Sequence, residues 1–303
     1  MNKHEFIERE KCNYPIEALC DAIGLSSAAY YSAKNRNPSK RDNENECIKE
    51  KILEVHKKSK HRYGHRPMYW HLKDEDVKCG RDRTRRLMKE LSIQPRKRVK
   101  FKPQVTDSKH GYGYSPNLLK SINKTNLAID EVWVADTTYI RIGFEWVYLA
   151  VVMDLSSRRI IGWSTSTTNN TALVVKALRN AVLSRAILPK GAIHHSDRGS
   201  TYASHQYQQL LRTYGMRSSM SAKGNCYDNA EMESFFGRYK SANIGNFTFS
   251  EPQEVRSHVF DYIEIFYNRY RKHSSIGYIS PIEFEEKNFP LRGRLVKDCL
   301  LNN

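Results

Sequence analysis

The stretch Val132-Trp133-Val134-Ala135-Asp136-Thr137-Thr138-Tyr139 combines β-branched, aromatic and apolar residues with a single acidic one. This composition predicts a β-strand. A carboxylate inside an apolar strand costs free energy unless it is paired or bound to a cation. The stretch therefore predicts a core strand and, at Asp136, a functional site.

The residues after this strand predict a mixed sheet with helices. Residues 146–153 form a continuous apolar run, and residues 159–164 predict a third strand. Short breaks at Ile142-Gly143 and Ser156-Ser157 suit antiparallel hairpins. Alternating helices and strands follow, which we expect at about 171–186 (helix), 192–195 (strand), 202–214 (helix) and 216–220 (strand). This order predicts a mixed α/β sandwich.

The N-terminal part is predicted to be helical. Residues 15–34 read as two short helices around Gly24, with Ser26 or Ser27 as the cap of the second helix. This pattern suits a helix-turn-helix, and an ordinary helical hairpin fits the segment equally well. Residues 35–46 are polar and predict a linker.

A second helical set, residues 47–102, ends in a strongly basic segment. The predicted helix through Leu87, Met88 and Leu91 carries most of its charges off its apolar face, which indicates a DNA-binding helix whose contacts are mostly to phosphates. A solvated charged face is the alternative, and a basic run just beyond the helix favours DNA. The basic residues are Arg83, Arg85, Arg86 and Lys89 on the helix, and Arg96, Lys97 and Arg98 in the run.

The net charge of the chain points to a polyanionic partner. The formal net charge is +17, and residues 1–128 hold 29 Lys and Arg against 16 Asp and Glu. Each cation placed on a phosphate releases counterions, so such a surplus favours nucleic acid. The sequence contains neither a run of 18 apolar residues nor a signal peptide, so it gives no indication of a membrane protein. We expect a cytoplasmic protein that binds nucleic acid.

The cysteines and histidines predict no metal site of their own. The six cysteines include no C-x-x-C pair, which fits reduced thiols. One cluster invites a zinc hypothesis, but it lacks a second cysteine, so helix-surface histidines are the preferred interpretation. The cluster comprises His56, His61, His65, His71 and Cys79.

Three carboxylates are candidates for the chemistry: Asp136, Asp197 and Glu233. Asp197 follows a predicted strand, and Glu233 opens a predicted helix after a Gly/Asn-rich loop. Carboxylates brought together repel one another, and divalent cations cancel that repulsion. Oxygen ligands favour Mg²⁺ or Mn²⁺. Among competing acids, Asp154 is interpreted as a turn residue, and Glu231 lies about 200° around the helix from Glu233.

The spacing and flanking residues of these acids resemble a known family. Sixty residues separate Asp136 from Asp197, and 35 separate Asp197 from Glu233. This pattern resembles the DDE signature of retroviral-integrase-like enzymes, which have a ribonuclease-H-like fold. The amino-acid sequence of residues 15–287 resembles those of the OrfB transposases of the third insertion-sequence family. The matching blocks are residues 133–139, 195–199, 223–230, 233–236 and 267–281.

The resemblance implies a metal-dependent DNA transposase. Asp136, Asp197 and Glu233 would hold two Mg²⁺ ions, for which Mn²⁺ can substitute, and Lys240 would grip DNA near the site. The implied reaction nicks the 3′ ends of an insertion element and joins them to target DNA through a circular intermediate. Double-stranded terminal repeats and target DNA, a homo-oligomer, and an upstream-frame partner or fusion are the implied partners. Thr201 departs from the Gln that is frequent in the family.

The expected architecture is an α/β, ribonuclease-H-like (retroviral integrase) catalytic core with an N-terminal all-α helix-turn-helix DNA-binding region. Two rival functions remain: a ribonuclease-H-like nuclease that cleaves RNA–DNA hybrids, and a catalytically silent DNA-binding regulator. The expected domains are 1–46 (helix-turn-helix and linker), 47–102 (second, basic helix-turn-helix), 103–128 (connector), 129–245 (catalytic core) and 246–303 (C-terminal helical extension).

Overall fold

The computed structural model describes residues 3–35, 37–94, 113–124, 126–185, 190–221, 229–241 and 248–288. The chain divides into two compact units, Met1–Leu53 and Glu54–Asn303. Within the described residues, no helix is long and apolar enough to cross a membrane.

The first unit packs short helices around a small core. Its helices are α1 (Lys3–Glu10), α2 (Ile16–Ala22) and α3 (Ser27–Lys34). Gly24 has a φ of +61°, as expected of a left-handed helix end, and the Ser26 side chain accepts a hydrogen bond from the Ala29 N–H to cap α3. The core consists of Ile7, Leu19, Cys20 and Tyr30. The two predicted helices are therefore present, and α1 is an addition.

A second helical group follows as α4 (Lys40–Lys58), α5 (His65–Asp74) and α6 (Arg81–Glu90). The expected linker 35–46 is wrong from Lys40 onward, because α4 begins there and runs through the predicted boundary at residue 46. Ser39 stabilises this start, since its side chain and that of Asp42 bond each other and the neighbouring backbone. On α6, Thr84, Leu87 and Met88 are buried, so its apolar face is the predicted one.

The sheet has the order β3-β2-β1-β4-β5. Strands β1 (Val132–Ile142), β2 (Glu145–Asp154) and β3 (Ile160–Ser166) are antiparallel, whereas β4 (Ile193–Ser196) and β5 (Arg217–Met220) run parallel to β1. The continuous apolar run lies in the centre of the antiparallel half, as predicted. The mixed α/β arrangement is therefore confirmed.

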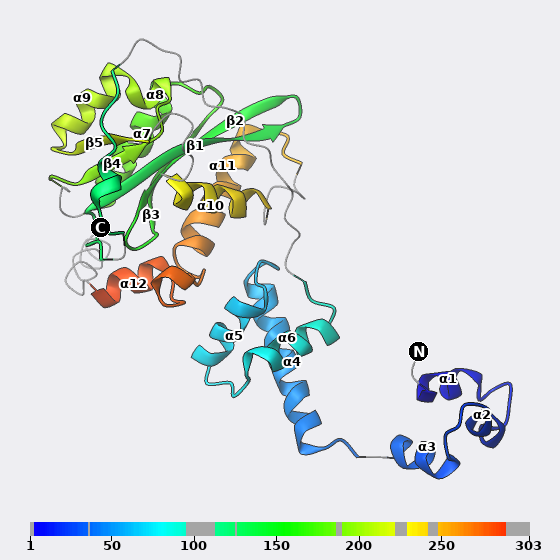
Figure 1. Ribbon diagram of the computed structural model, residues 1–303. Coiled ribbons are helices and arrows are strands. Elements are labelled where there is room, and N and C mark those ends of the chain that lie inside the picture. The colour runs from blue at the N-terminus through cyan, green and yellow to red at the C-terminus, as the bar shows by residue number, and fades with distance from the viewer. Residues whose placement is uncertain are drawn as a thin grey trace, which may run out of the picture. The chain divides into compact units, whose positions relative to one another are not determined.

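Helices cover both faces of this sheet (Figure 1). Helices α7 (Thr171–Leu183), α8 (Ser200–Ala203) and α9 (His205–Thr213) pack on one face and share a core with Trp133 and Ala135 of β1. A helix predicted at 202–214 is thus two helices, divided at Ser204. The opposite side carries α10 (Ala230–Tyr239), α11 (Pro252–Phe260) and the π-helical turn η4 (Asp261–Tyr267). A 3₁₀ turn, η1 (Leu118–Ser121), precedes β1.

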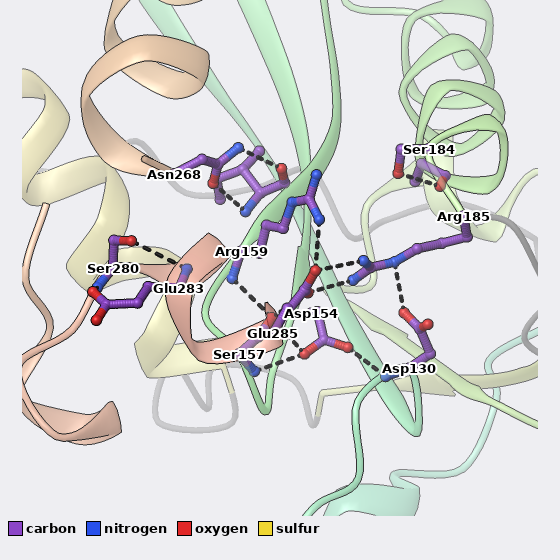
Figure 2. A network of polar contacts seen from close by, with 12 residues as sticks. Asp130, Asp154, Ser157, Arg159, Ser184, Arg185, Asn268, Ser280, Glu283 and Glu285 are labelled. Carbon is purple, nitrogen blue, oxygen red and sulfur yellow. Dashed lines mark hydrogen bonds and ion pairs between the residues drawn. The ribbon is translucent and has the colours of Figure 1, made fainter. Parts of the chain in front are cut away.

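The chain's last described elements, η5 (Ser274–Ile276) and α12 (Pro281–Asn288), are tied to the sheet by buried polar contacts. Figure 2 shows Glu285 of α12 facing Arg159 and Arg185. The Arg185 guanidinium donates to both carboxylate oxygens of Glu285, at 2.8 and 2.9 Å, and Arg159 donates at 2.6 Å. Asp154 accepts from the backbone N–H groups of Asp130 and Ser157, so it is the turn residue that was predicted.

Candidate active site

Asp136 lies where β1 outruns its neighbour β4. Strand β4 pairs with β1 only through Val132, Trp133 and Val134. The pairing therefore ends two residues before Asp136, which lies on the unpaired part of this edge of β1. The Asp136 side chain is half-buried and accepts a hydrogen bond from the Thr137 N–H at 2.7 Å. This backbone contact orients the carboxylate at the open edge.

Asp197 follows β4 directly and reaches the same edge. Parallel strands end on the same side of a sheet, and Val134 pairs with His195 in the register of β1 and β4. Extending that register by two residues sets Asp136 opposite Asp197. The Gly199 N–H donates to the Asp197 carboxylate at 2.9 Å, where the chain turns into α8. The fold therefore brings together two acids that lie 60 residues apart in the sequence.

The electrostatics of Asp136 reflect this meeting of charges. Burial raises the pKa of Asp136 well above its usual range, and the negative charge of Asp197 raises it further. Glu233 adds to the rise, whereas the Thr137 N–H and the Lys240 ammonium act against it. The site therefore holds excess negative charge in a poorly hydrated position, which a divalent cation would neutralise.

Glu233 belongs to the first turn of α10, as predicted. Its side chain is exposed, and partial loss of hydration raises its pKa. Glu231, the competing acid, lies within 3.5 Å of cations of Lys124 and Arg158 instead. Glu231 therefore forms ion pairs with Lys124 and Arg158. The two-residue separation of Glu231 and Glu233 on α10 gives the two carboxylates different surroundings, as predicted.

Lys240 lies at the end of α10 and stands near Asp136. Burial lowers its pKa to about 8, and the Asp136 charge opposes this change. Its ammonium lies 4.4 Å from the ring centroid of Tyr139, on β1. A half-buried cation beside the acidic edge can contact a DNA phosphate, which is the role that the resemblance implies.

The donor set suits a hard divalent cation, although the described residues hold no three His, Cys, Asp or Glu side chains gathered closely enough to form a metal site. The three carboxylates supply only oxygen ligands, which Mg²⁺ and Mn²⁺ prefer. Burial and the charges of Asp197 and Glu233 raise the pKa of Asp136 despite the opposing effects of Thr137 and Lys240, so a bound cation would stabilise the ionised carboxylate. The residues therefore fit a divalent cation in the chemistry of their ligand atoms.

Three neighbours of the carboxylates were not singled out by sequence reasoning. Tyr202 of α8 bonds the Thr137 hydroxyl at 3.1 Å, beside Asp136. The Asn229 side-chain amide donates to the Ala135 carbonyl at 3.3 Å and so ties the start of α10 to β1. Tyr139 packs under Lys240. Tyr139 and Asn229 lie in the quoted sequence blocks, but no pattern indicates their partners.

The predicted DNA-binding residues of α6 are on its solvent side. Arg85, Arg86 and Lys89 are exposed, Arg83 is half-buried, and Arg86 forms an ion pair with Glu90 at 2.7 Å. An exposed pair of this kind is weak and leaves the arginine accessible to phosphate. The predicted contacts Arg96, Lys97 and Arg98 lie outside the described residues, as does the block 223–228.

Three of the four histidines and the cysteine of the zinc hypothesis have partners of other kinds. The Tyr270 hydroxyl lies 3.1 Å from the His71 Nε2, the rings of His56 and His61 pack edge to face, and the Cys79 thiol lies 3.3 Å from the Thr84 hydroxyl. These contacts account for His56, His61, His71 and Cys79 through packing and hydrogen bonding.

Comparison with protein families identifies three matching regions. Residues 42–101 match an HTH-like domain, and residues 128–226 match the integrase core domain. A second integrase core domain family matches residues 233–289. The matches cover the helical group, the sheet with Asp136 and Asp197, and the helices that begin with Glu233.

Curated relatives agree with these matches. An uncharacterized 31 kDa protein of insertion element IS600 from Shigella sonnei is 39% identical over 269 residues, which cover 89% of this chain and 98% of that protein. Transposase InsF for insertion sequence IS3A from Escherichia coli (strain K12) is 35% identical over 94% of this chain and 99% of its own length. The catalytic core of BIV integrase aligns with a TM-score of 0.39 at 15% identity, over 52% of this chain and 95% of that one. The chain therefore belongs to the IS3-type family of DNA transposases, whose catalytic part is the integrase core domain.

Proposed function

We propose that this transposase nicks the 3′ ends of its insertion element and joins them to target DNA, using Asp136, Asp197 and Glu233 as its catalytic carboxylates. The observation that carries the proposal is the meeting of Asp136 and Asp197 at one edge of the sheet, where each raises the cost of the other's charge. This arrangement is suited to divalent-cation chemistry on phosphates.

The integrase core domain family depends on divalent metal ions. We propose two Mg²⁺ ions for this chain, with Mn²⁺ able to replace them. Asp136 and Asp197 would hold one ion, and Asp136 and Glu233 would hold the other. When bound, such a pair activates the attacking water or 3′-hydroxyl and stabilises the leaving oxygen.

The chain's own residues would hold the DNA around this chemistry. Lys240 is placed to neutralise a phosphate oxygen beside Asp136, because its ammonium already lies at the acidic edge. Tyr202 and Thr137 fix the backbone at the site through their hydroxyl contact. The exposed cations of α6, with the basic run 96–98, would bind the phosphates of double-stranded terminal repeats.

The wider organisation is also a proposal. We propose the domain division 1–46, 47–102, 103–128, 129–245 and 246–303, and the HTH-like match over 42–101 supports its second part. A reaction that pairs two element ends and a target requires more than one active site, which favours a homo-oligomer. An upstream-frame protein or fusion, and association with the nucleoid, complete the proposal.

A strand-transfer assay tests the proposed chemistry. The purified chain would be incubated with labelled element-end DNA and target plasmid, with Mg²⁺ or with EDTA. We expect joined products only with Mg²⁺. Glu233→Gln should abolish them, since an amide is a poor ligand that carries no charge.

Glu231→Gln is the matched control, because it lies on the same helix turn but pairs with Lys124 and Arg158. It should retain joining within a few-fold of the wild type. Equal activity of the Glu233→Gln variant and the wild type would contradict the assignment of Glu233. If the chain binds DNA without joining it, the fused form with its upstream frame would be assayed next, and binding without joining by that form would indicate a regulator. Cleavage of RNA–DNA hybrids alone would indicate the nuclease.

A further inference from the structure

The hairpin between β1 and β2 carries aromatic side chains that the carboxylate chemistry does not use. Phe144, at its turn, is 98% exposed, and Trp146 is 42% exposed. Exposing large apolar rings to water is unfavourable, and such surfaces mark interaction sites. We call Tyr139, Trp146 and Phe144 the aromatic track.

The hairpin extends beyond the rest of the sheet (Figure 1). Strand β4 pairs with β1 only as far as Val134, and the pairing of β3 with β2 begins at Tyr148. Beyond Tyr139 and Tyr148, which pair with each other, the hairpin is a two-stranded ribbon in which Arg141 pairs with Trp146. Gly143 turns the chain with a φ of +50°, a conformation that glycine adopts without strain. The tip with Phe144 is therefore presented to solvent by a well-defined turn.

The aromatic track begins at the active site. The Lys240 ammonium lies 4.4 Å from the Tyr139 ring centroid, and the rings of Tyr139 and Trp146 pack edge to face with centroids 4.8 Å apart. Tyr139 is three residues from Asp136 on β1, about 10 Å along the strand, and side-chain alternation directs the two to opposite faces. Lys240 links them at the edge, because its ammonium contacts the Tyr139 ring and its charge acts on Asp136. The pair of Arg141 and Trp146 is five residues from Asp136, or about 17 Å.

The chemistry of this surface matches nucleotides. Aromatic rings offer stacking platforms to bases, and neighbouring cations neutralise the strand's phosphates. Lys240 supplies a cation at the inner end, and Arg141, whose guanidinium donates to the Gly143 carbonyl at 2.9 Å, supplies one near the tip. The distance of about 17 Å from Asp136 to the pair of Arg141 and Trp146 matches roughly five base steps of 3.4 Å.

We propose that the aromatic track binds the unpaired bases of a DNA strand at the active site, with Phe144 and Trp146 as stacking residues. Bases in a duplex hide their faces in the helical stack, so exposed rings reach them only where the strand is unpaired or frayed. The proposal rests on the proposed function in one respect: DNA is the substrate whose strand passes Asp136.

Binding measurements without catalysis test the proposal. Fluorescence anisotropy in EDTA would compare a blunt 20-base-pair duplex with the same duplex carrying a 3′ tail of six thymidines. The wild-type chain should bind the tailed duplex more tightly. Phe144→Ala and Trp146→Ala should each weaken that binding by about fivefold or more, because one stacked base contributes about that factor. Affinity for the blunt duplex should stay unchanged.

Two further variants control for folding and for general hydrophobicity. Trp146→Phe keeps a ring against Tyr139 and should retain most of the preference for the tail. Leu183→Ala removes another strongly exposed apolar side chain, at the end of α7, and should change neither affinity. Thermal melting of each variant would verify that the fold is intact.

Photocrosslinking locates the contact directly. A 5-iodouracil in the tail crosslinks to aromatic rings that stack on it, and mass spectrometry should find the adduct on the peptide with Phe144 and Trp146. Equal binding of both duplexes by the wild type, or an equal loss on both duplexes in the variants, would overturn the proposal. Crosslinks without any strand transfer would leave it standing while the proposed function fails. Strand transfer without a preference for the tail would do the reverse.

Discussion

Glu285 and Asp154 show how partners decide the ionisation of buried carboxylates in this chain. Burial raises the pKa of Asp154 to about 6, even though backbone N–H groups donate to it. Burial also acts to raise the pKa of Glu285, but the hydrogen bonds and charge of Arg185, helped by Arg159, lower it to about 2. Glu285 is therefore ionised at neutral pH in the folded chain, because Arg185 and Arg159 are its partners (Figure 2).

The Arg185–Glu285 pair predicts a pH-dependent stability. The pKa of Glu285 is about 2 when folded and 4.5 ordinarily, so its ionised form stabilises the fold above about pH 4.5. That contribution is lost as the pH falls from 4.5 toward 2. Glu285→Gln should lower the free energy of unfolding at pH 7 by about 3 kcal/mol. Urea unfolding should show the difference falling to about half by pH 3.

Glu286→Gln, on the same helix but exposed, serves as the control and should change stability by less than about 0.5 kcal/mol at either pH. A Glu285→Gln variant as stable as the wild type at pH 7 would contradict the role of the pair.

At the scale of elements, the contact of α7 with β3 depends on one glycine. A Cβ atom at Gly162 would lie 2.4 Å from both the Ala177 carbonyl oxygen and the Ala181 nitrogen, which are backbone atoms of α7. Because backbone cannot move aside as a side chain can, Gly162→Ala should push α7 off the sheet. We expect a loss of about 1–3 kcal/mol in the free energy of unfolding, measured by urea denaturation.

Gly237→Ala provides the opposite case. A Cβ at Gly237, inside α10, meets nothing within 4 Å, so the higher helix propensity of alanine should stabilise the chain by up to about 1 kcal/mol. A Gly162→Ala variant that melts with the wild type would show that the helix and strand are not closely packed.

At the scale of the whole molecule, the unit Glu54–Asn303 joins the helix-turn-helix group to the C-terminal extension. The rings of Trp70 on α5 and Tyr278 stack with centroids 4.9 Å apart. The Tyr63 hydroxyl donates to the Tyr270 carbonyl at 2.8 Å, and Lys272 forms an ion pair with Asp74. The helices proposed to bind element ends are therefore held against the segment that follows α11 and η4.

This docking predicts a separation of binding from catalysis. Trp70→Ala should leave the affinity for element-end DNA within about threefold of the wild type, since the cations of α6 are untouched. Strand transfer should fall on the order of tenfold, because DNA held by the helices is no longer aligned with the carboxylates.

Trp70→Phe keeps a stacking ring and should restore most of the joining activity. Limited proteolysis should cut the Trp70→Ala variant faster between α6 and β1. Equal losses of binding and joining would instead indicate that Trp70 stabilises the helices themselves.

Local patterns account for the elements that the sequence predicts correctly. The three antiparallel strands and their turns follow from apolar runs and from breaks such as Ile142-Gly143, which depend on neighbouring residues only. The same local rules miss the start of α4 at Lys40, because a polar segment can become helical once its cap is made by Ser39 and Asp42. They also miss the division at Ser204, whose extended backbone ends α8 while its hydroxyl caps α9.

The sequence by itself determined which residues are candidates for the chemistry: the acids at 136, 197 and 233, and the lysine two helical turns after the last of them. Only the tertiary structure decided which groups meet, because parallel pairing of β1 with β4 joins positions that no local pattern links. It set Asp197 opposite Asp136, placed Lys240 over Tyr139, and left Phe144 in solvent. Burial and proximity, which a sequence does not state, then gave these groups their charges and their exposed surfaces.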